Sequence, residues 1–298
     1  MTDQDRGHGH PTEPEQPRRR TLMDLDAGQR IRLVNAMQAP TPVTRFTIGL
    51  IATIYIAFIV YNGRLEGQVR LDPGITNLLA ANWRPLIVGD HQYWRLLTSV
   101  FMHANLIHIG LNSWVIWVLG QPVEKLLGSA RLWILIVLAG LAGALASAVF
   151  NGNPSVGISG SAFGLLGAII VIGRKFREYM PEEMARRLTN SMLPILALNL
   201  VLGFTVPGID NAAHLGGLVG GGLVTALMAS QLNEDRHQRL RAQGVAGLLA
   251  GLVVMVWAAA VLHVVTCGTS TEAMDQCYIP ILLEHAPQEL IEQLIRFE

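Results

Sequence analysis

The sequence predicts an all-α, polytopic helical membrane protein. Of its 298 residues, 51% are hydrophobic and only 15% are charged, whereas a soluble domain usually has about 25% charged residues. The charged residues are concentrated near the N-terminus and in short segments between long apolar runs. Because each run is long enough to cross roughly 30 Å of hydrocarbon as a helix, we expect the chain to lie in a lipid bilayer.

Seven apolar stretches are expected to span the membrane. They cover residues 46–63, 99–119, 132–150, 158–174, 189–206, 211–230 and 244–265. The second, fourth and sixth stretches are less purely apolar, because they contain histidine, asparagine or serine. Polar and ionisable side chains are costly inside a membrane and are often functional there, so these three stretches are where we look for chemistry.

The placement of Lys and Arg predicts the orientation. With seven spans, 17 of the 22 basic residues fall on one side and five on the other. The more basic side is expected to be cytoplasmic, which puts the N-terminus inside and the C-terminus outside. The formal net charge is zero and the basic residues lie in loops without forming a basic face, so nucleic acid is not expected as a partner.

The chain divides into four expected parts. These are a disordered cytoplasmic tail over residues 1–42, a six-span core over 43–230, a cytoplasmic loop with the seventh span over 231–265, and an extracytoplasmic segment over 266–298. The tail is polar and lacks the apolar core of a signal peptide.

The two cysteines, Cys267 and Cys277, both fall in the last part. An extracytoplasmic location permits a disulfide, and two free thiols are an equally open interpretation. Two cysteines alone do not make a usual structural zinc site, and we expect neither a metal nor a cofactor.

Two polar residues stand at the heads of the fourth and sixth stretches. Gly157-Ile158-Ser159-Gly160 opens the fourth, and His214 opens the sixth ahead of a glycine-rich run. Both should lie near the outer ends of their helices, so their depths in the membrane match. Glycines four residues apart let a neighbouring backbone approach closely, and a serine with a histidine is a recurrent pairing of nucleophile and base.

Other interpretations of these residues stay open. Ser159 is equally typical of an ordinary helix N-cap. Ser161 competes as the nucleophile, although it lies about 200° round the helix from Ser159. Asp210 precedes His214 by four residues and is a candidate for orienting its imidazole.

The second stretch carries His103, His108 and Asn112. His108 and Asn112 are four residues apart and share one helix face. Their side chains are donors of the kind that stabilise an oxyanion, and the alternative is that they join neighbouring helices by hydrogen bonds. His103 lies just above them.

Together these motifs resemble the rhomboid family of intramembrane serine proteases. Five features occur in the family's order: Trp94-Arg95, His103 with His108 and Asn112, Glu124-Lys125-Leu126-Leu127-Gly128, Gly157-Ile158-Ser159-Gly160, and Ala213-His214 followed by glycines. The resemblance covers about residues 46–230. The seventh span is similar to the addition in the six-plus-one subgroup.

The resemblance implies a catalytic dyad, with Ser159 as nucleophile and His214 as base. It also implies an oxyanion hole formed by His108, Asn112 and the backbone N–H of Ser159.

Four further residues have supporting roles by the same resemblance: His103, Gly157, Gly160 and Phe163. Many family members have tyrosine where this chain has Phe163. Stacking on the base is therefore expected to remain, while any role of a phenol hydroxyl is lost.

The function that the resemblance implies is serine endopeptidase activity on single-span membrane proteins, within a bacterial plasma membrane. One alternative is a catalytically silent relative that binds membrane clients. Another is a transporter whose histidines carry protons, although the repeated halves common in transporters are not seen in the sequence. The sequence does not predict the oligomeric state.

Overall fold

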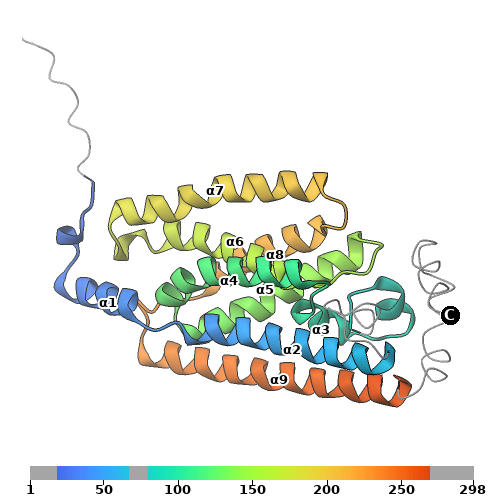
Figure 1. Ribbon diagram of the computed structural model, residues 1–298. Helices are drawn as coiled ribbons and strands as arrows, with labels where there is room; N and C mark the ends of the chain where they lie inside the picture. The colour runs from blue at the N-terminus through green and yellow to red at the C-terminus, as the bar shows by residue number, and fades with distance from the viewer. Residues whose placement is uncertain (1–18, 67–79, 269–298) are drawn as a thin grey trace, which may run out of the picture.

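The structure, a computed structural model, describes residues 19–66 and 80–268 and is built from helices packed side by side (Figure 1). Its elements are η1 (Leu22–Asp24), α1 (Ala27–Gln38), α2 (Pro42–Glu66), η3 (Pro85–Gly89), α3 (Arg95–Phe101), α4 (Leu106–Leu127), α5 (Ser129–Phe150), α6 (Ser159–Lys175), η4 (Arg177–Tyr179), α7 (Glu182–Thr205), α8 (Asn211–Leu227) and α9 (Arg236–Gly268). Over these residues the one β-type pairing is an isolated bridge between Asn82 and Ser155. The all-α prediction is confirmed.

The seven predicted apolar stretches fall on α2, α4, α5, α6, α7, α8 and α9. Five helical segments of the described chain are long and apolar enough to cross a membrane, and they fall on α1 with α2, on α4, on α5, on α7 and on α9. The protein is therefore an integral membrane protein. Helices α6 and α8 have 17 residues each, at the short end of the range that spans hydrocarbon, so seven crossings stay a prediction.

The second stretch, residues 99–119, is not one continuous helix. Helix α3 ends at Phe101, and α4 begins only at Leu106. The side chain of Asn105 accepts a hydrogen bond from the backbone N–H of His108 at 2.9 Å and caps α4, a role for which asparagine is among the preferred residues. His103 consequently lies in the connection between the two helices and not within the span.

The prediction of a disordered tail over residues 1–42 is wrong for its last part. Residues 1–18 lie outside the described residues, but η1 and α1 follow directly. Asp26 caps α1 in a reciprocal arrangement with Gln29, which is the capping-box signature. Leu25, just before α1, and Leu33 within α1 are buried as part of the hydrophobic core of the bundle.

The last predicted part, residues 266–298, is almost entirely outside the described residues, which end at 268. The pairing of Cys267 with Cys277 also lies outside them.

Helix α6 packs closely against α8 along facing glycines. A Cβ atom at Gly217 would overlap the carbonyl oxygen of Gly160, and one at Gly221 would overlap that of Gly164. These backbone contacts show that the two glycine-rich stretches pack against each other.

The second glycine stripe of α8 faces a helix that the sequence did not indicate. A Cβ atom at Gly216 would lie 2.5 Å from Cβ of Ala146, and one at Gly220 would lie 2.5 Å from Cβ of Ala142. Both alanines belong to α5. Helix α8 is therefore held between α5 and α6 with almost no side-chain spacing on either side.

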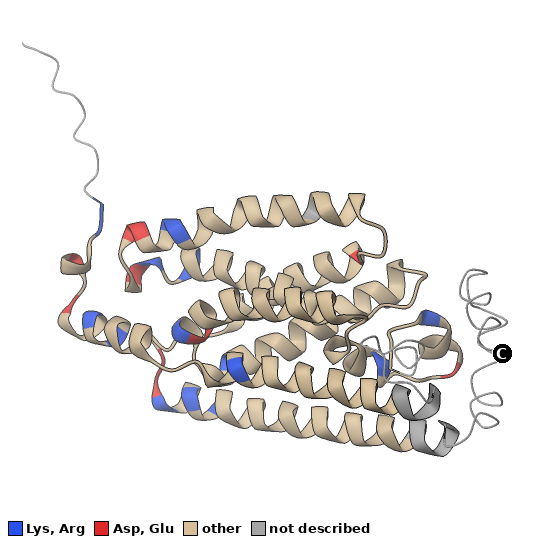
Figure 2. Ribbon diagram, in the orientation of Figure 1, with Lys and Arg blue, Asp and Glu red and all other residues tan. Residues whose placement is uncertain are grey.

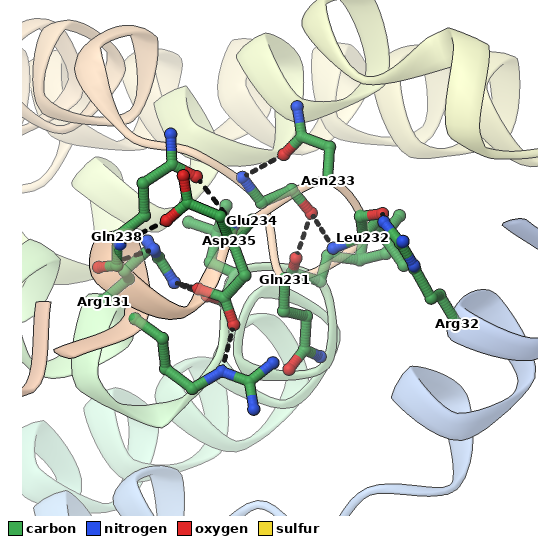
Figure 3. Close-up of polar contacts among 12 residues, drawn as sticks. Arg32, Arg131, Gln231, Leu232, Asn233, Glu234, Asp235 and Gln238 are labelled. Carbon is green, nitrogen blue, oxygen red and sulfur yellow. Dashed lines mark hydrogen bonds and ion pairs between the residues drawn. The ribbon is translucent and has the colours of Figure 1, made fainter. Parts of the chain in front are cut away.

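Basic residues gather at the end of the bundle where α1 lies and where α6 ends (Figure 2). There Glu234 is 3% exposed and pairs with Arg131 of α5, which is also buried. Arg239 of α9 donates from Nε to the same carboxylate at 2.8 Å. Figure 3 shows this network, which fastens the start of α9 to α5.

We predict that Gly217→Ala destabilises the protein. The added methyl group meets backbone atoms of α6 that have no room to move, and overpacking of this kind costs about 1–3 kcal/mol. Gly251→Ala on α9 is the matched control, because nothing lies within 4 Å of its added methyl group and alanine favours helix. Thermal unfolding in detergent should show a lower midpoint for the first variant alone, and equal midpoints would contradict the packing described.

We also predict that Glu234→Gln lowers stability by on the order of 3 kcal/mol, because it leaves the buried Arg131 without a counter-charge. Glu183→Gln removes an exposed carboxylate that pairs with Arg187, and it should change little. Urea titration of both variants measures the difference. Similar curves would show that the pair at Glu234 is replaceable by neutral hydrogen bonds.

Candidate active site

Ser159 and His214 come together although 55 residues separate them in the sequence. Ser159 is the first residue of α6, and His214 lies in the first turn of α8. Nε2 of His214 lies 3.0 Å from Oγ of Ser159, and both residues are half-buried. This is hydrogen-bond distance and the arrangement that an activated nucleophile requires.

The interpretation of Ser159 as an ordinary N-cap is wrong. Ile158 occupies the N-cap position of α6 and makes no side-chain cap. The hydroxyl of Ser159 is directed at the imidazole instead. Its backbone N–H belongs to the first turn, where N–H groups have no partner within the helix and the helix dipole favours negative charge.

Ser161, the competing nucleophile, faces the other way. Its hydroxyl donates to the backbone oxygen of Ile136 in α5 at 2.7 Å and is fully buried. The structure therefore brings one of the two serines, Ser159, to His214.

Phe163 stacks on the imidazole. The ring centroids of Phe163 and His214 are 4.1 Å apart, and the ring planes differ by 11°. Phe163 lies one turn after Ser159 on α6, so the helix that supplies the hydroxyl also supports the imidazole. This contact restricts rotation of the His214 ring.

Asp210 does not contact the His214 imidazole. Its carboxylate accepts from the backbone N–H of Ala213 at 2.9 Å and from the hydroxyl of Ser147 at 2.5 Å. Within the described residues, Nδ1 of His214 is buried and has no hydrogen-bond partner. The geometry is that of a pair of residues and not of a triad.

His108 and Asn112 line the approach to Ser159. A Cβ atom at Gly157 would lie 2.9 Å from Nε2 of His108 and 3.9 Å from Nδ2 of Asn112. Gly157 also has φ of 130°, a conformation that residues with a side chain rarely adopt. Only glycine therefore lets the segment before Ser159 pass beside the two donors.

The tautomer of His108 follows from its other nitrogen. Nδ1 accepts from the backbone N–H of Ala104 at 3.4 Å, so a neutral ring carries its proton on Nε2, the atom beside Gly157. The side-chain amide of Asn112 donates to the backbone oxygen of His108 at 3.1 Å, which uses one of its two N–H groups.

His103 packs behind this layer. It is 1% exposed, and its ring meets that of His108 edge to face with centroids 5.1 Å apart. It makes no contact with the Ser159 hydroxyl among the described interactions. Gly160, in contrast, is the residue after Ser159 in α6, and its lack of a side chain lets the backbone of α8 approach.

Asn82 is a site residue that sequence reasoning missed. Its backbone exchanges two 2.9 Å hydrogen bonds with Ser155, and its side chain donates to the backbone oxygen of Ala144 at 2.6 Å. A cavity of about 20 Å³ lies between these residues, Ser147 and Gly157. No local pattern marks Asn82, because its partners are more than 60 residues away.

Comparisons with known proteins agree with these observations. Residues 90–231 match the family model described as Rhomboid domain. The chain is 35% identical over 142 residues to Rhomboid protease GluP of Bacillus subtilis (strain 168), covering 48% of this chain and 27% of that protein. It is 36% identical over 140 residues to RHOMBOID-like protein 1 of Arabidopsis thaliana, covering 47% and 35%.

Another relative is named inactive. Inactive RHOMBOID-like protein 8 of Arabidopsis thaliana is 30% identical over 140 residues, which cover 46% of this chain and 38% of that protein. The matches thus extend over about a quarter to two fifths of the length of these three relatives.

We predict that Ser159 reacts selectively with a fluorophosphonate, because its hydroxyl alone of the two serines contacts an imidazole. Ser159→Ala should abolish labelling, whereas Ser161→Ala should retain it. Mass spectrometry of the labelled peptide identifies the modified residue. Labelling of the Ser159→Ala variant at the wild-type level would contradict the geometry.

Proposed function

Because the chain belongs to the rhomboid family, we propose that it is an intramembrane serine endopeptidase with Ser159 as nucleophile and His214 as general base. The observation that carries the proposal is the 3.0 Å contact between Oγ of Ser159 and Nε2 of His214. A hydroxyl and an imidazole at this distance are equipped for acyl transfer.

The reaction proceeds through an acyl-enzyme. Oγ of Ser159 attacks the scissile carbonyl carbon while Nε2 of His214 takes its proton. The protonated imidazole then donates this proton to the leaving amine as the C–N bond breaks. A water molecule, deprotonated by the same nitrogen, attacks the ester, and its cleavage returns the proton to Ser159.

Three donors are available to stabilise the oxyanion in this proposal. Nε2–H of His108 and Nδ2–H of Asn112 lie beside Gly157, and the N–H of Ser159 heads a helix. Donors fixed before the reaction stabilise the developing charge without reorganising. The position of His108 and Asn112 beside the segment that leads into Ser159 supports the oxyanion role.

The general base works without a carboxylate partner in this proposal. Stacking of Phe163 replaces orientation by an acid, since it holds the ring plane while leaving Nδ1 without a hydrogen-bond acceptor among the described residues. Turnover is expected to be slow, because a base without an orienting acid loses much of its efficiency.

The substrates that fit this site are single-span membrane proteins. A helix in lipid satisfies its own backbone, so the scissile carbonyl becomes available only where the substrate helix is weak. Water is also required, and the polar-lined cavity beside Gly157 is large enough for about one molecule.

The orientation in the membrane follows from charge. Helix α6 begins at Ser159 and ends at the basic end of the bundle. With the basic end in the cytoplasm, the site opens toward the outer face of a bacterial plasma membrane, the N-terminus is cytoplasmic and the C-terminus extracytoplasmic.

Purified protein in liposomes, given a fluorogenic single-span substrate, tests the proposal. Wild type should cleave it, and Ser159→Ala and His214→Ala should not. Asn112→Ala should lower kcat by about 10²–10³, the usual effect of losing one oxyanion donor. Gln121→Ala, on the same helix but away from the site, is the matched control.

Two outcomes would overturn the proposal. Equal cleavage by wild type and Ser159→Ala would remove the assigned nucleophile. Binding of the substrate without cleavage by the folded wild type would favour a silent relative that binds membrane clients.

A further inference from the structure

Asp210 connects the first turn of α8 to α5. One carboxylate oxygen accepts from the backbone N–H of Ala213 at 2.9 Å, and the backbone oxygen of Asp210 accepts from the N–H of His214 at 3.1 Å. The other carboxylate oxygen accepts from the hydroxyl of Ser147, which is 2% exposed in the last turn of α5. The residue that begins the turn carrying His214 is therefore tied to a neighbouring helix.

This hydrogen bond matters because the faces of α8 that meet α5 and α6 carry few protruding side chains. Glycines face both α5 and α6, so few side chains interlock to fix the position of α8 along its axis. Apart from the contact between Ser159 and His214 itself, hydrogen bonds from side chains join the two ends of α8 to neighbouring helices at two places in the described structure. One is Asp210 with Ser147 at the start of α8, and the other is Lys175 of α6 with the carbonyl of Ala226 in the last turn and that of Met228 just after it.

The position of His214 along this axis decides its distance to Ser159. Both residues stand in the first turns of their helices, and the contact between them is 3.0 Å. A misplacement of about 1 Å in a catalytic group can cost roughly 10²-fold in rate. A contact that fixes the start of α8 therefore bears directly on the distance between His214 and Ser159.

From this geometry we infer that Asp210 is a positioning residue, which with Ser147 sets the register of α8 so that His214 meets Ser159. The inference rests on the proposed protease function. Asp210 acts through the backbone of α8 and through α5, and it does not act as a third catalytic group, because its oxygens accept from Ala213 and Ser147 while Nδ1 of His214 has no hydrogen-bond partner among the described residues.

Three substitutions distinguish the positioning role of Asp210 from the effect of its negative charge. Asp210→Ala removes both hydrogen bonds, and we expect kcat to fall about 10- to 100-fold with KM little changed. Asp210→Asn retains an acceptor for Ala213 and offers an N–H to the Ser147 oxygen, so it should restore kcat to within a few-fold of wild type. Ser147→Ala keeps the hydrogen bond from Ala213 to Asp210 but loses the hydrogen bond to α5. Its kcat should lie between those of the two Asp210 variants.

Lys175→Met provides the control for general loss of stability, because it removes the contact at the opposite end of α8. It should lower the unfolding midpoint while kcat per labelled active site stays near that of wild type. Fluorophosphonate labelling counts the competent molecules in every sample.

A second measurement does not depend on proteolysis. In the full-length protein, Asp210→Ala should speed amide hydrogen exchange at residues 211–214, and Asp210→Asn should not. If the wild type is inactive, the protease proposal is wrong, but amide hydrogen exchange still tests the role of Asp210. Unchanged exchange in Asp210→Ala, equal loss of kcat in the Asn and Ala variants, or an equal loss in Lys175→Met would each overturn the positioning role.

Discussion

The close approach of three helix backbones is the constraint on which the site depends. Glycines at facing positions let α8 lie against α6 on one side and α5 on the other. Ser159 and His214 project from the first turns of two helices in contact, and short side chains can meet there only if the backbones nearly touch. In a bilayer, apolar side chains gain little by leaving lipid for one another, so this packing is the main source of association between the helices.

The polar groups that such a bundle needs are gathered at its two ends. At the basic end, Glu234 with Arg131 secures the start of α9, and Glu124 accepts from the N–H groups of Val43 and Thr44 at 2.9 Å to cap the start of α2. At the other end lie Ser159 and His214. The middle of the bundle is left to apolar and small residues, which is how a membrane protein combines satisfied backbone groups with a local polar site.

The sequence predicted the fold class and the matching depths of Ser159 and His214, because apolar runs and loop lengths are local signals. It did not predict the break before Leu106, although Asn105 is a recognisable N-cap, because the run of apolar residues conceals it. Helix α1 was not predicted, because the polar composition of residues 1–42 was given more weight than the capping residues Asp26 and Gln29. Contacts of Asn82 were out of reach, because they depend on residues brought together only by the completed fold.

The segment that leads into Ser159 is held by backbone hydrogen bonds to other parts of the chain. Ser155 is joined to Asn82 by two backbone bonds, and the N–H of Gly157 donates to the backbone oxygen of Ser99 at 2.9 Å. Residues 155 to 157 are thus fixed by hydrogen bonds to two other parts of the chain. A shift of Asn82 would therefore also move the peptide units that precede Ser159, because backbone hydrogen bonds join the two segments.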